Sequence, residues 1–156
     1  MTGKTVAIAI VALLAVAPAA GTPAAPEIDL KIKIAVPERP VPAGAEGEAV
    51  VTLAPPSGIH LNQYPPIRLT LEPSPPLVFP KTEIKVGLDK MPENLEQNPF
   101  TTIDPIHVKF SVGKHDGDGR ISVKGKLRFF YCVAKSGYCA PGAKDISFSV
   151  PVTTAP

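Results

Sequence analysis

The sequence predicts an all-β fold, and more closely an antiparallel β-sandwich of about eight strands. Apolar and polar residues alternate with a period of two in most segments of the chain. The chain contains 20 prolines and no tryptophan, and a proline inside a helix costs about 3 kcal/mol. Turn-forming residues separate the alternating segments, as in antiparallel sheets that bury one face and expose the other.

The chain begins with a segment typical of a secretory signal peptide. Lys4 precedes an apolar run over residues 6–17, which is followed by small residues and proline. This run is too short to span a bilayer. We therefore assign residues 1–21 to a signal peptide and residues 22–26 to a disordered Ala/Pro linker. We expect an exported, periplasmic protein with no stable membrane insertion.

The remainder of the chain has the length of one domain. Roughly 130 residues are enough for one core and too few for two ordinary domains. We expect a single domain over residues 27–152 and a disordered tail over 153–156. The formal net charge is +2 and the two signs are interleaved, which argues against nucleic-acid binding. Motifs for hydrolase or nucleotide chemistry are absent from the sequence, so neither activity is expected.

Eight segments are expected to form strands, either because apolar and polar residues alternate in them or because they lie between segments that alternate. Pro55-Pro56, Pro65-Pro66 and Pro75-Pro76 recur ten residues apart, but the residues between them do not match, so we interpret them as strand punctuation. The longest stretch without alternation, Asp89 to Asp104, is either a lid or a long crossover. The expected strands are 28–36, 48–53, 59–62, 67–71, 84–88, 106–112, 121–131 and 146–152.

The segment from His115 to Gly119 admits two interpretations. Its spaced aspartates resemble part of a calcium loop, but the third acidic position and the distal glutamate are missing. An Asp-Gly pair between two alternating segments favours a hairpin turn instead. The three histidines, His60, His107 and His115, show no ligand spacing. We therefore expect neither a metal site nor a cofactor.

The two cysteines, Cys132 and Cys139, are the informative chemical feature. In an exported chain a disulfide is their default state. Such a bond closes a ring of about eight residues, which limits its stabilisation to roughly 2.5 kcal/mol. A short ring can stiffen one hairpin but cannot join distant strands, so it is a poor staple for the fold. The pair is either a local structural bond or an exchanging thiol pair.

The charge around the cysteines favours exchange. No acidic residue lies between Arg120 and Lys144, and nearby positive charge stabilises a thiolate. The opposing interpretation is that the cations form the solvated face of a strand. Strand parity places Cys132 on that wetter face, together with Phe130. The cations are Arg120, Lys124, Lys126, Arg128, Lys135 and Lys144.

The segment from Leu127 through Cys132 to Cys139-Ala-Pro141 resembles the amino-terminal periplasmic domain of the DsbD family of thiol:disulfide interchange proteins. The stretch Gly58-Ile-His60-Leu-Asn62 is similar to a strand of that domain. The resemblance implies an immunoglobulin-like sandwich with a cysteine pair near one end. It also implies that the pair receives electrons from a membrane electron-carrier protein and passes them to periplasmic thioredoxin-like proteins, with Cys139 forming the mixed disulfide.

The chain also departs from the family pattern. Six residues separate the cysteines, one more than is usual in the family. The adjacent aromatic pair of the family's cap loop is not recognisable, although the loop from Asp89 to Asp104, with Phe100, is similar in position. No membrane or thioredoxin domain follows before Pro156. Either these partners are separate proteins, or the fold has lost the relay and keeps an inert disulfide.

The leading hypothesis is therefore a thiol-disulfide exchange module. The rival is a non-catalytic immunoglobulin-like binding or structural domain, and a third idea is copper binding by the two cysteines with Met91. Cys132 and Cys139 are the candidate exchanging residues, and the candidate supporting residues are Phe100, Phe130, Tyr131, Lys135 and Tyr138.

Overall fold

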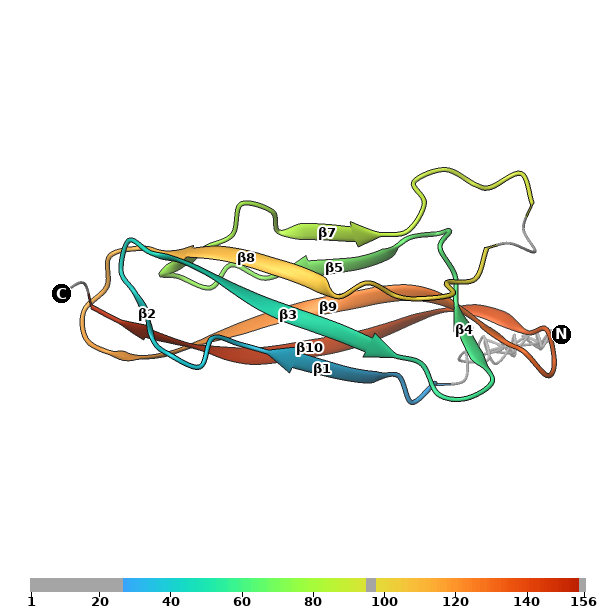
Figure 1. Cartoon of the computed structure of the whole chain (residues 1–156), viewed down its shortest axis with the longest axis horizontal. Coiled ribbons are helices and arrows are strands. Elements are labelled where there is room, and N and C mark those ends of the chain that lie inside the picture. Colours follow the sequence, from blue (N-terminus) through green and yellow to red (C-terminus); the bar gives the residue numbers. More distant parts are fainter. Residues whose placement is uncertain (1–26, 95–97, 155–156) are drawn as a thin grey trace, which may run out of the picture.

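All regular elements in the part of the chain that the structure describes are strands. The computed structural model describes residues 27–94 and 98–154 (Figure 1). The expected signal peptide and linker lie outside these residues. Within them, ten strands and no helix are found, so the predicted all-β class is confirmed.

Each of the eight expected segments overlaps a strand, but the last strand begins at Cys139 and not at the expected Ile146. The two additional strands, β2 (Val41–Pro42) and β6 (Leu77–Val78), have two residues each, which is too short for alternation to be visible in the sequence. The strands are β1 (Lys31–Ala35), β2 (Val41–Pro42), β3 (Glu46–Ala54), β4 (Ile59–Leu61), β5 (Ile67–Leu71), β6 (Leu77–Val78), β7 (Glu83–Val86), β8 (Ile106–Val112), β9 (Gly119–Val133) and β10 (Cys139–Thr153).

The strands form two sheets. One sheet has four strands in the order β1-β3-β8-β6, and the other has the order β2-β10-β9-β5-β7, with β4 also paired to β9. All pairs in these sheets are antiparallel except β2 with β10, which run parallel where Val41 lies opposite Val152. The expectation of purely antiparallel pairing is therefore wrong at this one position.

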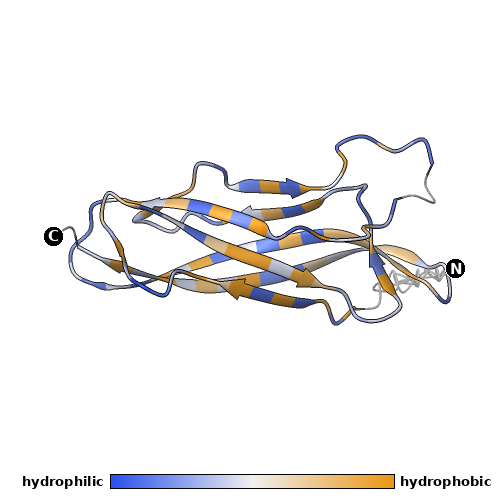
Figure 2. Ribbon diagram, in the orientation of Figure 1, coloured by the Kyte–Doolittle hydropathy of each residue, from blue (hydrophilic) through white to orange (hydrophobic). Residues whose placement is uncertain are grey.

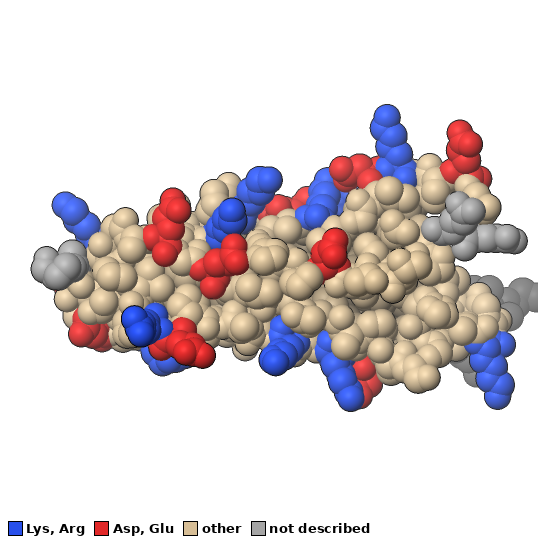
Figure 3. All heavy atoms as spheres, in the orientation of Figure 1, with Lys and Arg blue, Asp and Glu red and all other residues tan. Residues whose placement is uncertain are grey.

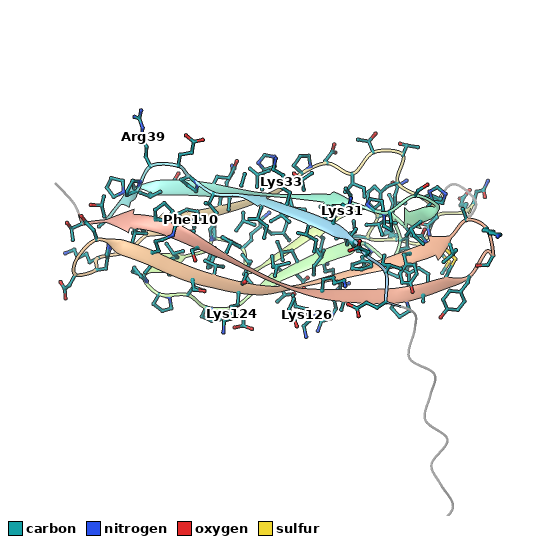
Figure 4. All side chains as sticks on the ribbon, turned by 90° about the horizontal axis from the view of Figure 1, so that it is seen from below. Lys31, Lys33, Arg39, Phe110, Lys124 and Lys126 are labelled. Atoms are coloured by element: carbon teal, nitrogen blue, oxygen red, sulfur yellow. A yellow bond between two sulfur atoms is a disulfide. The ribbon has the colours of Figure 1, made fainter. Side chains whose placement is uncertain are left out.

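The alternation in the sequence becomes one shared core. Figure 2 shows apolar and polar residues alternating along the strands, and Figure 4 shows the side chain of Phe110 between the layers. In β8, Ile106, Val108 and Phe110 are buried and His107 between them is exposed. Residues from both sheets form a single hydrophobic cluster. Burial on one face of each strand is what a period of two predicts.

The segment from His115 to Gly119 is not a hairpin turn, and the prediction there is wrong. Strand β8 pairs with β3 and β6, whereas β9 pairs with β10, β5 and β4. The Asp-Gly turn therefore carries the chain from one sheet to the other. Gly117 has a φ of 78°, which suits glycine. A turn at Asp116-Gly117 was predicted correctly. Strand β9 does not pair with β8, because β3 and β6 already pair with its two edges.

The carboxyl end is more ordered than expected. Thr153, assigned from sequence to a disordered tail, is the last residue of β10. The Thr153 hydroxyl and the Thr154 backbone N–H both donate to the Asp118 carboxylate, at 2.6 and 2.9 Å. Residues 155–156 lie outside the described residues. The Pro-Pro pairs each fall between consecutive strands, as predicted for punctuation.

Candidate functional site

The two cysteines close the longest hairpin of the molecule. Strands β9 and β10 pair over 14 residues, and Cys132 lies directly opposite Cys139 as the pair nearest the turn. The two residues form a disulfide, and their Cα atoms are 4.1 Å apart. Figure 4 shows the sulfur atoms at one end of the elongated molecule. The disulfide expected from sequence is therefore present.

The turn that follows is held by backbone hydrogen bonds. The Val133 N–H donates to the Tyr138 carbonyl and the Gly137 N–H donates to the Val133 carbonyl, both at 2.8 Å. The Ala134 N–H donates to the Gly58 carbonyl, before β4. Gly137 has a φ of 68°, a conformation that glycine adopts readily. The turn is therefore held by backbone hydrogen bonds in addition to the disulfide.

The two sulfur-bearing residues differ in exposure. Strand β4 pairs with β9 and places His60 opposite Cys132, so that Cys132 is half-buried. Strand β10 has no paired strand on its other edge near Cys139 among the described residues, because β2 joins it only at Val152 and Thr153. Cys139 is consequently exposed. A partner can reach Cys139 more easily than Cys132.

The two sulfur atoms also have different polar neighbours. The side-chain amide Nδ2 of Asn62 donates to the Sγ of Cys132 across 3.4 Å. The carbonyl oxygen of Gly137 lies 3.6 Å from the Sγ of Cys139. A donor therefore faces one sulfur and an acceptor faces the other. No role was predicted for Asn62, because a polar residue at the end of a strand carries no signal of a sulfur contact.

Residues 98–100, within the segment from Asp89 to Asp104, lie beside β4. Asn98, which is buried, accepts from the Tyr64 N–H and donates to the Tyr64 carbonyl, both at 2.8 Å. The Phe100 N–H donates to the Leu61 carbonyl, and Asn62 bridges to Pro99. These three residues thus lie next to the strand that flanks Cys132 (Figure 1). The Phe100 side chain packs against the hydrophobic core.

The cationic side chains do not gather at the disulfide as the sequence suggested. Lys126 pairs with Asp145 at 3.4 Å, and Lys144 pairs with Glu27, so acids from other segments neutralise them. Arg128 is four residues from Cys132 along β9, which is about 13 Å at the usual strand rise. At that distance salt screens its charge. Among the predicted cations, Lys135 in the turn lies nearest to the cysteines in the chain.

Charges of both signs are also mixed on the face of the molecule seen in Figure 3. Figure 3 shows acidic and basic side chains interspersed on the face in view. Figure 4 shows Lys124 and Lys126 on the outer side of the sheet and away from the sulfur atoms. The solvated-face interpretation therefore accounts for these lysines.

The aromatic candidates divide into three environments. Tyr131 is buried, with its ring centroid 6.3 Å from that of Phe129. Burial raises the pKa of the Tyr131 phenol, and the nearby Tyr138 raises it further. Tyr138 itself is 45% exposed in the turn. Phe130 is half-buried on the outer face, the same face as Cys132, as strand parity predicted.

A surface hollow of about 670 Å³ lies next to the disulfide end of the sheet. Phe130 and Pro141, which face each other across β9 and β10, line it two residues from the cysteines. Pro65 and Pro66 add further apolar lining, and Arg68, Glu83 and Arg128 contribute charge. Cys139, an exposed residue, therefore lies two residues along β10 from a surface with apolar side chains.

The remaining features considered from the sequence are the copper ligand Met91, a metal site and a membrane span. Met91 is 63% exposed in the long loop. Residues 27–94 and 98–154 contain no cluster of three or more His, Cys, Asp or Glu side chains arranged to hold a metal. No helix in these residues is long and apolar enough to cross a membrane.

No family model, curated protein or solved structure matches the chain.

Proposed function

We propose that this protein is a thiol-disulfide exchange module whose reactive pair is Cys132 and Cys139. The observation that carries the proposal is the exposed Cys139, bonded to a half-buried Cys132 at the turn end of a hairpin. Exchange requires a thiolate to approach one sulfur in line with the S–S bond, so access decides which sulfur reacts. Cys139 has that access.

The proposed reaction moves two electrons. A thiolate of a dithiol partner attacks the Sγ of Cys139, the S–S bond breaks, and its electron pair remains on Cys132 as a thiolate, which takes up a proton. The second thiol of the partner then attacks the mixed disulfide and releases Cys139. The partner leaves as a disulfide and this protein is reduced. The reverse sequence oxidises this protein.

The bond is poorly placed for a purely structural role. It joins residues that already face each other in a paired hairpin, and it links neither the two sheets nor distant strands. Its small ring limits the stabilisation to roughly 2.5 kcal/mol. The turn keeps its own backbone hydrogen bonds. An inert disulfide would therefore add little that the hairpin lacks.

The proposal places the protein in the periplasm, where the signal-peptide pattern of residues 1–21 would direct it and where disulfides persist. Its partners would be a membrane electron-carrier protein on one side and thioredoxin-like proteins on the other, as the resemblance to the DsbD family implies. Tyr138, Lys135 and Phe130 surround the reactive end and would contact such partners. No cofactor is needed, because the electrons travel in the sulfur–sulfur bond.

Trapping of mixed disulfides tests the proposal. A Cys132→Ser variant, which leaves Cys139 free, should form a mixed disulfide rapidly with a thioredoxin that lacks its resolving cysteine and carries thionitrobenzoate on its remaining cysteine, and thionitrobenzoate leaves as the new S–S bond forms. The matched Cys139→Ser variant should react at least tenfold more slowly, since Cys132 is less exposed. If neither variant forms a mixed disulfide faster than the unfolded chain does, the disulfide is structural and the proposal fails.

A further inference from the structure

The surroundings of the two sulfur atoms make the disulfide asymmetric. An N–H donor contacts Cys132, and a carbonyl oxygen lies near Cys139. A donor stabilises a thiolate, whereas a carbonyl oxygen presents negative charge and disfavours one. When the bond breaks, the electron pair is therefore better accommodated on Cys132.

The donor is the side chain of Asn62, and the fold fixes its position. Asn62 follows β4, and its backbone N–H donates to the Phe130 carbonyl at 2.9 Å. On its other side it bridges to Pro99. Because His60 lies opposite Cys132, Asn62 is the diagonal neighbour of Cys132 on the same face. The amide Nδ2 reaches the sulfur at 3.4 Å.

The burial of Asn62 argues against an accidental contact. The residue is only 5% exposed, and its Oδ1 is buried without a hydrogen-bond partner. A buried polar atom without a partner destabilises the folded state. The backbone pairing of Asn62 would be the same with an apolar side chain of similar shape, such as leucine. The amide therefore carries a cost in folding free energy, and its hydrogen bond is the one with Cys132.

We propose that Asn62 is a hydrogen-bond donor to the leaving sulfur, so that it directs attack to Cys139 and stabilises the thiolate of Cys132. This inference rests on the proposed exchange function. As the partner thiolate bonds to the Sγ of Cys139, the electron pair of the broken bond passes to the Sγ of Cys132, where the Asn62 N–H meets the developing charge. A more stable leaving thiolate departs faster.

The elements packed against Cys132 bring few other groups that could control its ionisation. They are His60 on β4, Lys135 and Tyr138 in the turn, and Tyr131 on β9. Among the described side chains, Asn62 alone forms a hydrogen bond with the Cys132 sulfur. A test must therefore change Asn62 and leave these four residues in place.

The test measures the ionisation of Cys132 in the Cys139→Ser background, where it is the single thiol. The rate of alkylation by iodoacetamide is recorded against pH, with and without Asn62→Leu. Loss of the donor should raise the pH of half-ionisation by about 1, which is a roughly tenfold smaller thiolate fraction below that pH. Asn62→Asp, which keeps the shape of the side chain and adds a negative charge, should raise it further.

Ser136→Ala is the matched control. The Ser136 hydroxyl lies in the turn between Cys132 and Cys139, and it accepts a hydrogen bond from the Tyr138 N–H and not from either sulfur. It should leave the ionisation of Cys132 unchanged. If Asn62→Leu and Asn62→Asp give the same pH of half-ionisation as the parent, the inference is overturned. If Asn62→Leu does not fold, Asn62→Asp decides alone. The measurement needs no redox partner, so failure here leaves exchange itself intact, whereas a failed trapping experiment removes the exchange function directly.

Discussion

At the scale of single residues, two glycines matter because aromatic rings cover them. Gly47 lies opposite Phe110 in the four-stranded sheet, and Gly142 lies opposite Phe129 in the hairpin that carries the disulfide. A Cβ on Gly47 would come within 2.5 Å of the Phe110 ring, and one on Gly142 would collide with the Phe129 ring. Such pairs let a large ring pack flat over a strand.

Gly47→Ala should therefore destabilise the protein by about 1–3 kcal/mol, because the buried Phe110 ring has to move. Chemical denaturation monitored by circular dichroism measures the change. Gly119→Ala is the control, since an added Cβ there meets nothing within 4 Å, and it should be close to neutral. Equal destabilisation by both variants would show that lost glycine flexibility, rather than the ring, sets the cost.

The sequence predicted the cysteine pair and the face of β9 on which Cys132 lies, but not the polar and charged neighbours of the pair. Strand parity correctly placed Cys132 and Phe130 on the outer face, because a period of two survives in a long hairpin. Asn62 was missed, since its contact with Cys132 depends on how β4 registers against β9. The cations were misjudged because Glu27 and Asp145, which neutralise Lys144 and Lys126, come from outside the acid-free segment.

At the scale of elements, the loop before β9 fastens the end of β10. Asp118 accepts from the Thr153 hydroxyl and from the Thr154 N–H. The hydrogen bond from Thr153 and, to a smaller extent, the one from the Thr154 backbone hold the pKa of Asp118 below its usual range. A carboxyl group whose pKa is lowered by folding stabilises the folded state above its unfolded pKa of about 3.9 and loses that contribution as the pH falls through the lower folded value.

Asp118→Asn should consequently destabilise the protein at neutral pH, and the difference from the parent should shrink once the pH falls below about 4. Free energies of unfolding from urea titrations over this pH range measure it. Asp116→Asn, in the same loop, is the control and should show a smaller difference. A difference between Asp118→Asn and the parent that stays constant down to the lowest pH would contradict the assignment.

The same loop shows why pairing is harder to predict than strands. The alternating segments on both sides of Asp116-Gly117 were recognised, and the Asp-Gly signal indicates a reversal of the chain. Whether the reversed strand joins its predecessor depends on which sheet edges are free. Strand β3, far earlier in the chain, already pairs with one edge of β8. Local sequence carries no information about that occupancy, and the same holds for the parallel pairing of β2 with β10.

At the scale of the whole molecule, stability rests on the core that both sheets share. The buried side chains come from strands of both sheets, and no residue of the turn at the disulfide belongs to the fully buried cluster. The bond between Cys132 and Cys139 closes only the end of one hairpin. The fold should therefore persist without it.

A Cys132→Ala/Cys139→Ala double variant tests this independence. Its free energy of unfolding should fall by no more than roughly 2.5 kcal/mol, and its far-ultraviolet circular dichroism should match that of the parent. The parent protein reduced with dithiothreitol serves as the matched control and should behave alike. Loss of β-structure in the absence of denaturant would mean that the disulfide holds the fold together.

The central claim is that the disulfide exchanges electrons, and its reduction potential tests this most directly. The purified protein is equilibrated in glutathione redox buffers, and the fraction with free thiols is measured by alkylation and mass spectrometry. An exchanging pair should give a potential between about −120 and −270 mV. A potential more negative than about −300 mV is typical of structural disulfides and would contradict the account.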